Sequence, residues 1–325
     1  MKFYIAPMEG ITGYIYRNTY QEYFKDGDVY VTPFIAPTQK RCMRTREYTD
    51  VLPENNTGKY VIPQIITNKA EDFVWTAGRL KELGYTDVNL NLGCPSGTVV
   101  AKKKGAGFLG VPDLLDRFFE ETFSLMDREK LDMKVSIKTR VGMSSPDEFE
   151  DLIPIYNRYP LDEVMIHPRT RKDQYKNHPD LDAFSLGVKE LKHTICYNGD
   201  IFDEASYKNI CERFPSVDRV MLGRGLIANP GLIRQITTGE VMDKELFIKF
   251  HNELFRRYKE QSFGDKVLLF KMKELWIYMI CSFTNGELYR KKLLKAKKVS
   301  EFQAVVANIF SREEISGGPY VPGMR

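Results

Sequence analysis

Eight short, strand-like runs alternate with helical patterns over roughly the first 235 residues, and this alternation restricts the possible folds more than any other feature of the chain. Strands that alternate with helices pair in parallel, because each crossover helix returns the chain to the same end of the sheet. Eight such units fit a (β/α)8 barrel, whose usual size is about 250 residues. The expected strands are residues 3–6, 29–31, 60–65, 87–91, 134–139, 163–167, 194–197 and 218–222.

Local patterns predict helices between these strands. Residues 70–83 carry Phe73, Ala77 and Leu80 at helical spacing, which indicates an amphipathic helix. Residues 145–148, Ser-Pro-Asp-Glu, combine an N-cap, a proline at the first helical position and an acidic third position, which predicts a helix start. A doubly wound sheet is the alternative, but no G-x-G-x-x-G motif follows the first expected strand. We therefore expect an α/β protein with a TIM barrel.

After Gly239 the sequence predicts helices only. Apolar residues recur at helical spacing in 246–258, a second helix is expected over 267–283, and a basic third one over 287–298. Ser300-Glu301-Phe302-Gln303 has the form of a capping box that opens a fourth helix. Four helices of this length can bury a core of their own. We predict a barrel over residues 1–238 and a small C-terminal four-helix bundle over residues 239–325.

The positive charge of the chain is concentrated in this C-terminal part. Residues 240–325 contain 16 Lys and Arg against 11 Asp and Glu, a net charge of +5, whereas residues 1–239 have a net charge of −1. Such an excess fits a domain that meets a polyanion. A solvated helical surface is the other interpretation, and charge alone leaves both open.

Cysteine spacing and hydropathy exclude several classes of protein. The five cysteines form no C-x-x-C pair, so we expect no metal site and a reducing, cytoplasmic environment. The most apolar stretch, residues 267–283, is interrupted by Lys271, Lys273 and Glu274, so no membrane span is predicted. We expect a monomer.

Polar residues and glycines recur just after the expected strands. In a barrel of parallel strands the carboxyl ends of all strands lie on the same face, so these residues should lie close together. Cys94 follows the fourth strand on a loop bounded by glycine and proline, where it is either a catalytic thiol or a buried structural cysteine. The other strand ends carry Met8, Gln64, Asn91, Lys138, His167, Asn198-Gly199-Asp200 and Gly223-Arg224-Gly225.

This set of side chains suits a planar, amide-rich, phosphorylated cofactor. Gln64 and Asn91 offer donors and acceptors for a pyrimidine-dione edge, and Lys138 can place a positive charge beside a ring that gains electrons. The glycines at 199, 223 and 225 expose backbone N–H groups near the last helix, and Arg224 adds a cation, as in the usual barrel phosphate site. Flavin mononucleotide (FMN) fits the whole set.

Six motifs, taken in order, resemble those of the tRNA-dihydrouridine synthases. The resemblance covers the barrel throughout and extends to the helical bundle, which that family uses to hold tRNA. The motifs are Ala6-Pro7-Met8-Glu9-Gly10-Ile11-Thr12, Asn89-Leu90-Asn91-Leu92-Gly93-Cys94-Pro95, Ile137-Lys138-Thr139-Arg140, His167-Pro168-Arg169-Thr170, Asn198-Gly199-Asp200-Ile201 and Gly223-Arg224-Gly225.

The resemblance implies an FMN-dependent reduction of a specific uridine in tRNA to 5,6-dihydrouridine, with NADPH as the electron donor. It implies that Cys94 is the acid that protonates C5 of the base. Basic residues expected to hold the RNA are Arg140, Arg169, Arg171, Lys291, Lys292 and Lys295, each with a solvated surface position as the alternative. The residues that the resemblance places around the flavin are Pro7, Met8, Gln64, Asn91, Lys138, His167, Asn198, Gly199, Asp200, Gly223 and Arg224.

Two other functions compete with this one. The first is an FMN barrel oxidoreductase acting on a free small molecule, in the manner of a dihydroorotate dehydrogenase or an ene-reductase. The basic helical bundle disfavours it, because a small substrate gives the bundle no role. The second is an RNA-binding protein without catalysis, which the combination of Cys94, Lys138 and His167 disfavours.

Overall fold

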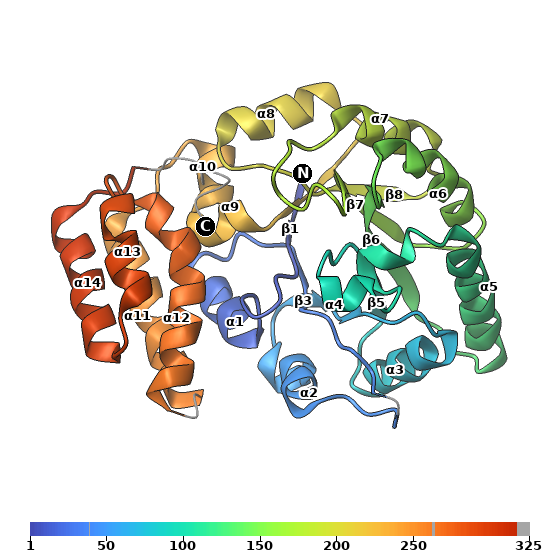
Figure 1. Cartoon of the computed structure of the whole chain (residues 1–325), viewed down its shortest axis with the longest axis horizontal. Helices are drawn as coiled ribbons and strands as arrows, with labels where there is room; N and C mark the ends of the chain where they lie inside the picture. Colours follow the sequence, from blue (N-terminus) through green and yellow to red (C-terminus); the bar gives the residue numbers. More distant parts are fainter. Residues whose placement is uncertain (39, 262–263, 317–325) are drawn as a thin grey trace. The chain divides into compact units, whose positions relative to one another are not determined.

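Nine parallel strands form a single sheet in the computed structural model, which describes residues 1–38, 40–261 and 264–316. The strand order is β3-β2-β1-β9-β8-β7-β6-β5-β4. The strands are β1 (Lys2–Ile5), β2 (Val29–Val31), β3 (Tyr60–Ile62), β4 (Gln64–Ile65), β5 (Asp87–Leu92), β6 (Lys134–Gly142), β7 (Glu163–Thr170), β8 (Thr194–Tyr197) and β9 (Arg219–Leu222) (Figure 1).

The two strands at the ends of this order belong to one continuous run. β3 and β4 are separated only by Pro63, which has no N–H to donate to a neighbouring strand. The Pro63 carbonyl still accepts a hydrogen bond from the N–H of Asn89 in β5 (2.9 Å), and Ile35 beyond β2 pairs with Ile65 of β4. The sheet therefore closes into a barrel, and the predicted (β/α)8 barrel is confirmed, with the expected strand 60–65 divided at Pro63.

The chain forms two compact units, each assembled from separate segments. Unit 1 consists of Met1–Pro7, Val29–Gly199 and Phe214–Met221. Unit 2 consists of Met8–Asp28, Asp200–Arg213 and Leu222–Arg325. The two predicted domains, residues 1–238 and 239–325, are each continuous in sequence, whereas these units are not. The assignment of catalysis to the first domain and of tRNA binding to the second stays a prediction.

The described residues of unit 1 form the barrel strands and six α-helices. Figure 1 shows α5, α6 and α7 in succession outside strands β5 to β8, and consecutive helices of this group contact each other. The predicted helix 70–83 is α3, and the predicted start at 145–148 is a 3-10 turn in which the Glu148 carboxylate accepts the Ser145 N–H (3.0 Å). The helices are α2 (Thr45–Val51), α3 (Ala70–Glu82), α4 (Gly97–Val100), α5 (Pro112–Arg128), α6 (Phe149–Tyr156) and α7 (Leu181–Glu190).

The interior of the barrel has an apolar part and a polar part. The side chains of the apolar part come mainly from β1–β3 and β7–β9, whereas β4, β5 and β6 contribute amides, a hydroxyl and an amine. Burial of polar groups is costly unless they are hydrogen-bonded, so the polar part needs a specific network. The apolar cluster is Tyr4, Ala6, Val29, Val31, Ile62, Met165, Cys196 and Met221.

Unit 2 contains four C-terminal helices that run side by side, as Figure 1 shows, together with helices from earlier in the chain. Within this unit α1 packs on α11, where the Phe250 ring meets the rings of Tyr16 and Phe24 with centroids 5.9 and 5.1 Å apart. The four predicted C-terminal helices are confirmed. The helices are α1 (Tyr14–Tyr23), α8 (Glu204–Arg213), α9 (Arg224–Ala228), α10 (Leu232–Thr238), α11 (Lys244–Gln261), α12 (Asp265–Met279), α13 (Glu287–Lys295) and α14 (Val299–Arg312).

The predicted capping box at residues 300–303 is wrong. Helix α14 begins at Val299, and its cap uses Glu301 rather than Gln303. The Glu301 carboxylate accepts the backbone N–H groups of Lys297 (2.8 Å) and Lys298 (3.4 Å), which precede the helix. A carboxylate binds such N–H groups more strongly than an amide oxygen does, and the N-cap is Lys298, two residues before the predicted Ser300.

The core of unit 2 contains a histidine whose titration should affect stability. His251 is 4% exposed, its ring lies 5.5 Å from that of Trp276 and 5.2 Å from that of Phe310, and burial lowers its pKa to about 4. Between pH 6.5 and 4 the unfolded chain binds this proton and the folded chain does not, so the free energy of unfolding falls as the pH falls. The loss amounts to about 3 kcal/mol across that window.

We expect His251→Leu to remove this part of the pH dependence. Chemical denaturation at pH 7 and pH 4 would measure it as the difference between the variant and the parent. The parent is the necessary reference because a second buried group also makes stability depend on pH. Burial raises the pKa of Glu163 in unit 1 to about 7. That carboxyl stabilises the fold below pH 4.5, and this contribution is lost as the pH rises through 7. An identical pH dependence in both proteins would contradict the prediction.

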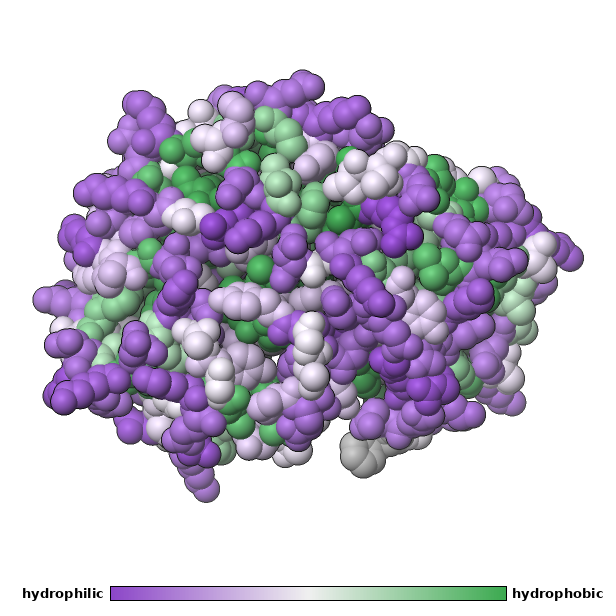
Figure 2. Space-filling model, turned by 180° about the vertical axis from the view of Figure 1, so that it is seen from behind, coloured by the Kyte–Doolittle hydropathy of each residue, from purple (hydrophilic) through white to green (hydrophobic). Residues whose placement is uncertain are grey.

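One face of the surface carries its apolar residues in small groups. Figure 2 shows a face that is mostly hydrophilic, with hydrophobic residues in separate areas, an arrangement common on soluble domains. Among the described residues, no helix has the length and apolar character needed to cross a membrane.

Candidate active site

Strands β4 to β6 place their polar side chains in two successive rows inside unit 1. In the first row, the register pairs Gln64 with Asn89 and Asn89 with Ser136. In the second row, two residues nearer the carboxyl ends of the strands, it pairs Asn91 with Lys138. Residues two apart on a strand share a face, so both rows point into the barrel. The structure thus brings together the predicted residues Gln64, Asn91 and Lys138.

A tight turn after β5 holds the backbone of Cys94 at the carboxyl end of the barrel. The Oδ1 atom of Asn91 accepts the N–H groups of Gly93 (3.1 Å) and Cys94 (2.9 Å). The Cys94 carbonyl accepts the N–H of Ala106 (3.1 Å), and Arg140 Nε donates to the Gly93 carbonyl (2.9 Å). The half-buried Cys94 side chain therefore extends from a segment that is fixed on both sides.

Gly105 contributes to this fixation, although the sequence analysis did not select it. Its φ of +54° lies in the left-handed region that favours glycine. A Cβ atom at this position would lie 2.9 Å from the carbonyl oxygen of Cys94 and 3.0 Å from its Cβ. A glycine is therefore required where the segment after α4 packs against Cys94.

The hydrogen bonds of Asn91 limit what it can offer a ligand. Its Oδ1 already accepts two backbone N–H groups, and its Nδ2 donates to Gln64 Oε1 (2.7 Å). An amide has two lone pairs on oxygen and two N–H donors. Asn91 therefore has one N–H left to donate and no free acceptor, so the predicted pair of donor and acceptor is reduced to a donor. A ligand atom facing Asn91 must be an acceptor such as a carbonyl oxygen.

Lys138 is a half-buried residue of β6 that pairs in register with Asn91 of β5, so its amine lies beside the row of amides. Within the described part of the chain, no carboxylate or carbonyl accepts a hydrogen bond from its Nζ atom. Burial, followed by the nearby positive charge of Arg140, lowers the pKa of Lys138 to about 7. An anionic or electron-rich group placed beside this amine would favour its charged form.

His167 lies one step beyond the row of Lys138, because Arg140 pairs with His167 in the register of β6 and β7. Its Nε2 atom is 3.1 Å from Nη1 of Arg169. A guanidinium group only donates, so Nε2 accepts and the proton of the neutral ring is on Nδ1. The imidazole is 8% exposed, and His167, which was expected to end its strand, lies within β7 because that strand continues to Thr170.

Arg140 and Arg169, two of the predicted RNA-binding residues, are each 1% exposed. Arg140 Nη1 donates to the carbonyls of Thr170 (2.8 Å) and Gln174 (3.0 Å), and Arg169 Nε donates to that of Asn177 (2.6 Å). Both guanidinium groups therefore hold the loop between β7 and α7 to the barrel, and their contact with RNA stays a prediction.

Arg171, on the same loop, is a more accessible candidate. It is half-buried, whereas Arg140 and Arg169 are each 1% exposed; its Nε atom is itself buried and has no hydrogen-bond partner among the described residues. A partly exposed guanidinium group is suited to phosphate, which it can bind through two nitrogens. We therefore rank Arg171 above Arg140 and Arg169 as an RNA contact.

The remaining predicted cofactor residues of unit 1 are half-buried and lie at the ends of β1 and β8. Pro7 follows β1. Asn198 Nδ2 donates to the Met221 carbonyl (2.8 Å), which ties β8 to β9. At Gly199 a Cβ atom would lie 2.3 Å from the hydroxyl oxygen of Tyr197, so the close approach of this side chain requires glycine.

The predicted cofactor residues of unit 2 include a buried ion pair. Arg224, at the start of α9, is 9% exposed and donates through Nη2 to Asp200 Oδ1 (2.6 Å). Gly223 precedes it as the N-cap, and Met8 forms a turn in which its carbonyl accepts the N–H of Thr12 (3.0 Å). Arg224 thus has a fixed orientation, but Asp200 offsets part of its charge.

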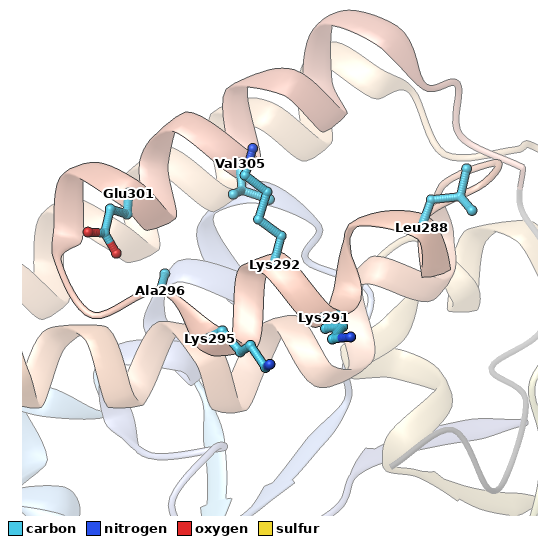
Figure 3. A pocket seen from close by; sticks show the side chains of 7 residues that line it. All are labelled: Leu288, Lys291, Lys292, Lys295, Ala296, Glu301 and Val305. Carbon is cyan, nitrogen blue, oxygen red and sulfur yellow. The ribbon is translucent and has the colours of Figure 1, made fainter.

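The predicted lysines Lys291, Lys292 and Lys295 are exposed on α13 and line a groove of about 540 Å³ between α13 and α14. Figure 3 shows the Lys292 side chain reaching toward Val305 of α14. The groove walls are completed by Leu288, Ala296, Glu301 and Val305.

Over residues 1–38, 40–261 and 264–316, no three His, Cys, Asp or Glu side chains are grouped so that they could bind a metal ion.

Comparison with solved structures identifies the class of fold. The chain is similar to a structure of morphinone reductase in complex with tetrahydroNAD, with a TM-score of 0.51 and 14% sequence identity, over 76% of this chain and 90% of that one. A likeness at this level of identity establishes the barrel fold and no shared activity.

Sequence comparison identifies the family. The model of the dihydrouridine synthase (Dus) family matches residues 4–314. The chain is 26% identical over 317 residues to a probable tRNA-dihydrouridine synthase of Staphylococcus aureus strain COL, covering 94% of this chain and 92% of the relative. It is 27% identical over 247 residues to the tRNA-dihydrouridine(16) synthase of Shigella flexneri, covering 74% and 76%. The chain belongs to the dihydrouridine synthase family, an oxidoreductase family, and the resemblance stated from its motifs is confirmed.

Proposed function

We propose that this chain reduces specific uridines in tRNA to 5,6-dihydrouridine, with FMN as its cofactor and NADPH as the electron donor. The observation that carries the proposal is the fixed Cys94 loop at the same end of the barrel as the amine of Lys138, in a chain of this family. A chain that reduces tRNA fits the cytoplasmic monomer expected from the sequence.

The residues of unit 1 fit a flavin ring. Asn91 has a single N–H to offer, and Gln64 has one N–H beyond the bond that it gives to Asn89 (2.8 Å). Both can donate to carbonyl oxygens of the kind that a flavin carries, and Lys138 brings an amine with no protein acceptor among the described residues. When bound, the flavin would supply the hydride for C6 of the uracil ring.

Cys94 is the proposed proton donor. Saturation of the C5–C6 bond needs a hydride at C6 and a proton at C5, and a thiol with the usual cysteine pKa of about 8.5 keeps its proton at neutral pH. The hydrogen bonds to Gly93 and Cys94 fix the backbone from which the sulfur extends. Lys138 provides positive charge where electron density increases during the reaction.

Arg224 of unit 2 is the proposed ligand of the flavin phosphate. Asp200 fixes the guanidinium through one of its nitrogens. Gly225, the next residue, lets the start of α9 approach the Ile201 carbonyl, because a Cβ there would lie 2.4 Å from that oxygen. Charge-assisted contacts to phosphate are among the strongest hydrogen bonds in proteins.

Uridine in a folded tRNA must leave its stack before a pocket can reach it, at a cost of a few kcal/mol. Contacts to the RNA backbone offset this cost, and we assign them to the exposed lysines of α13 and to Arg171. The assignment explains the excess of positive charge in residues 240–325.

Replacing Lys291, Lys292 and Lys295 together with alanine should weaken tRNA binding and reduce its salt dependence. Each lost phosphate contact lowers the slope of log K against log salt by about 0.7–0.9. A matched control replaces three exposed lysines of unit 1, Lys81, Lys130 and Lys189, with the same change in net charge. Equal slopes for the parent and the α13 variant, measured by filter binding across salt concentrations, would contradict the assignment.

A spectroscopic experiment separates this function from reduction of a free small molecule. Without oxygen, NADPH should bleach the yellow protein, and tRNA that lacks dihydrouridine should restore the colour. Free uridine and a small unsaturated ketone should not restore it at the same concentration. Recovery with the small molecules and none with tRNA would favour the alternative enzyme, and a colourless protein that binds tRNA would favour an RNA-binding role.

A further inference from the structure

A directional chain of hydrogen bonds connects the middle of β6 with the Cys94 loop through Ser136 and Asn89, which the proposed reaction does not use, and then through the proposed flavin ligands Gln64 and Asn91. Ser136 Oγ accepts from Asn89 Nδ2 (2.9 Å), and Asn89 Oδ1 accepts from Gln64 Nε2 (2.8 Å). Gln64 Oε1 accepts from Asn91 Nδ2 (2.7 Å), and Asn91 Oδ1 holds the backbone N–H of Cys94 (2.9 Å).

This chain ends on a backbone group at each side, one that can only donate a hydrogen bond and one that can only accept. At one end the N–H of Cys94 can only donate, so Asn91 must turn its oxygen toward it. At the other end the Ser136 hydroxyl donates to the Val88 carbonyl (3.2 Å), so its oxygen accepts from Asn89. Only one orientation of the three amides satisfies both ends, because turning any one of them would oppose two donors or two acceptors.

The inner members of the chain are shielded from solvent and have no acid or base chemistry of their own. Gln64 and Asn89 are 0% exposed and Ser136 is 4% exposed. A buried amide that loses its partner keeps the cost of leaving water, so the network resists rearrangement as a whole. The orientation of Asn89 is therefore coupled through Gln64 to the orientation in which Asn91 presents its oxygen to Cys94.

We propose that Asn89 and Ser136 are positioning residues for Cys94, acting through Gln64 and Asn91. This inference rests on the proposed role of Cys94 as the proton donor. The acceptor oxygen of Asn89 is its essential feature, because it fixes the orientation of Gln64 and thereby that of Asn91.

Two substitutions at one position test this inference. Asn89→Leu keeps a similar volume but removes the acceptor for Gln64, so both amides beyond it can turn and release the Cys94 backbone. Asn89→Asp keeps an oxygen for Gln64, and the Ser136 hydroxyl can donate to its second oxygen in place of the Val88 carbonyl, so the orientation toward Cys94 should be preserved. Tyr156→Phe is the matched control, because it deletes one buried hydroxyl that contacts Thr139 on β6 (3.0 Å) outside this chain of amides.

Turnover on tRNA per bound flavin is the first measurement. We expect Asn89→Leu to lower kcat by about 10- to 100-fold with KM for tRNA within about twofold, because misplacement of a catalytic group affects the chemical step. We expect Asn89→Asp and Tyr156→Phe to stay within about threefold of the parent. A kcat for Asn89→Leu that is also within threefold, or equal losses for Leu and Asp, would overturn the inference.

Alkylation by iodoacetamide gives a readout that does not depend on turnover. Mass spectrometry of the holoenzyme would compare modification of Cys94 with that of the exposed Cys42 in the same sample. A released loop should raise the Cys94-to-Cys42 ratio several-fold in Asn89→Leu and leave it unchanged in Asn89→Asp. An unchanged ratio in Asn89→Leu would overturn the inference, whereas full activity of Cys94→Ala would instead refute the proposed acid while leaving the alkylation result valid.

Discussion

Replacing Cys94 with alanine is expected to slow dihydrouridine formation by a factor of about 10²–10⁴, the usual contribution of one positioned acid. Flavin binding and reduction by NADPH should continue, because the amides and the amine of the proposed ring site do not include the thiol. The structure supports a catalytic rather than a packing role for Cys94, because four hydrogen bonds fix the backbone of Gly93 and Cys94 while the thiol side chain stays half-buried.

Rapid-quench measurement of dihydrouridine with pre-reduced enzyme would test this prediction at the chemical step. Cys42→Ala provides the matched control, because the same atoms are removed from an exposed cysteine of the same unit. Single-turnover rates within threefold of the parent for Cys94→Ala would show that another group donates the proton.

Replacing Arg224 with alanine is expected to weaken FMN binding by about 10- to 100-fold, as loss of a charged hydrogen bond of about 1.5–3 kcal/mol implies. The structure adds a second cause, since Arg224 is the cation that faces the Asp200 carboxylate at 2.6 Å. Without Arg224, that carboxylate would repel a phosphate. The variant should therefore purify with little or no yellow colour.

Two further variants make this prediction specific. Asp200→Asn keeps the guanidinium and removes the competing charge, so FMN should bind at least as tightly as in the parent. Arg234→Ala removes an arginine of the same unit that lies near Asp26 (3.8 Å) and should retain its flavin. Titration of apoprotein with FMN would measure all three, and full affinity in Arg224→Ala would mean that the phosphate lies elsewhere.

The barrel could be predicted from the sequence because strand and helix periodicities are local properties. The placement of Gln64, Asn91 and Lys138 near the carboxyl ends of neighbouring strands could be predicted for the same reason, and the register brings them close together, while their role at a cofactor stays a prediction. Asn89 lies two residues before Asn91 on the same strand and has the same type of side chain. It was not predicted as a site residue, because it lies within the strand and not at the end where a ligand is expected.

Other features depend on contacts between distant segments. The burial of Arg140 and Arg169 follows from a loop whose carbonyls reach back to β6 and β7, and the sequence does not specify this path. The packing of α1 on α11 brings together residues more than 200 positions apart in the sequence. Local sequence patterns do not predict such contacts, and for this reason the predicted domain boundary at 238/239 separates two helices that pack together. A truncation after Gly239 would expose Tyr16 and Phe24, and point substitutions on α13 therefore test RNA binding more cleanly.

The central claim is that the chain reduces uridine within tRNA and that Cys94 supplies the proton. The most direct measurement is mass spectrometric mapping of tRNA lacking dihydrouridine after incubation with the holoenzyme and NADPH in deuterated water. We predict a specific uridine that gains two hydrogens, with deuterium at C5 from the exchangeable Cys94 thiol, and no such product with Cys94→Ala under matched conditions. Unmodified tRNA in the presence of an NADPH-reducible flavin would contradict the account.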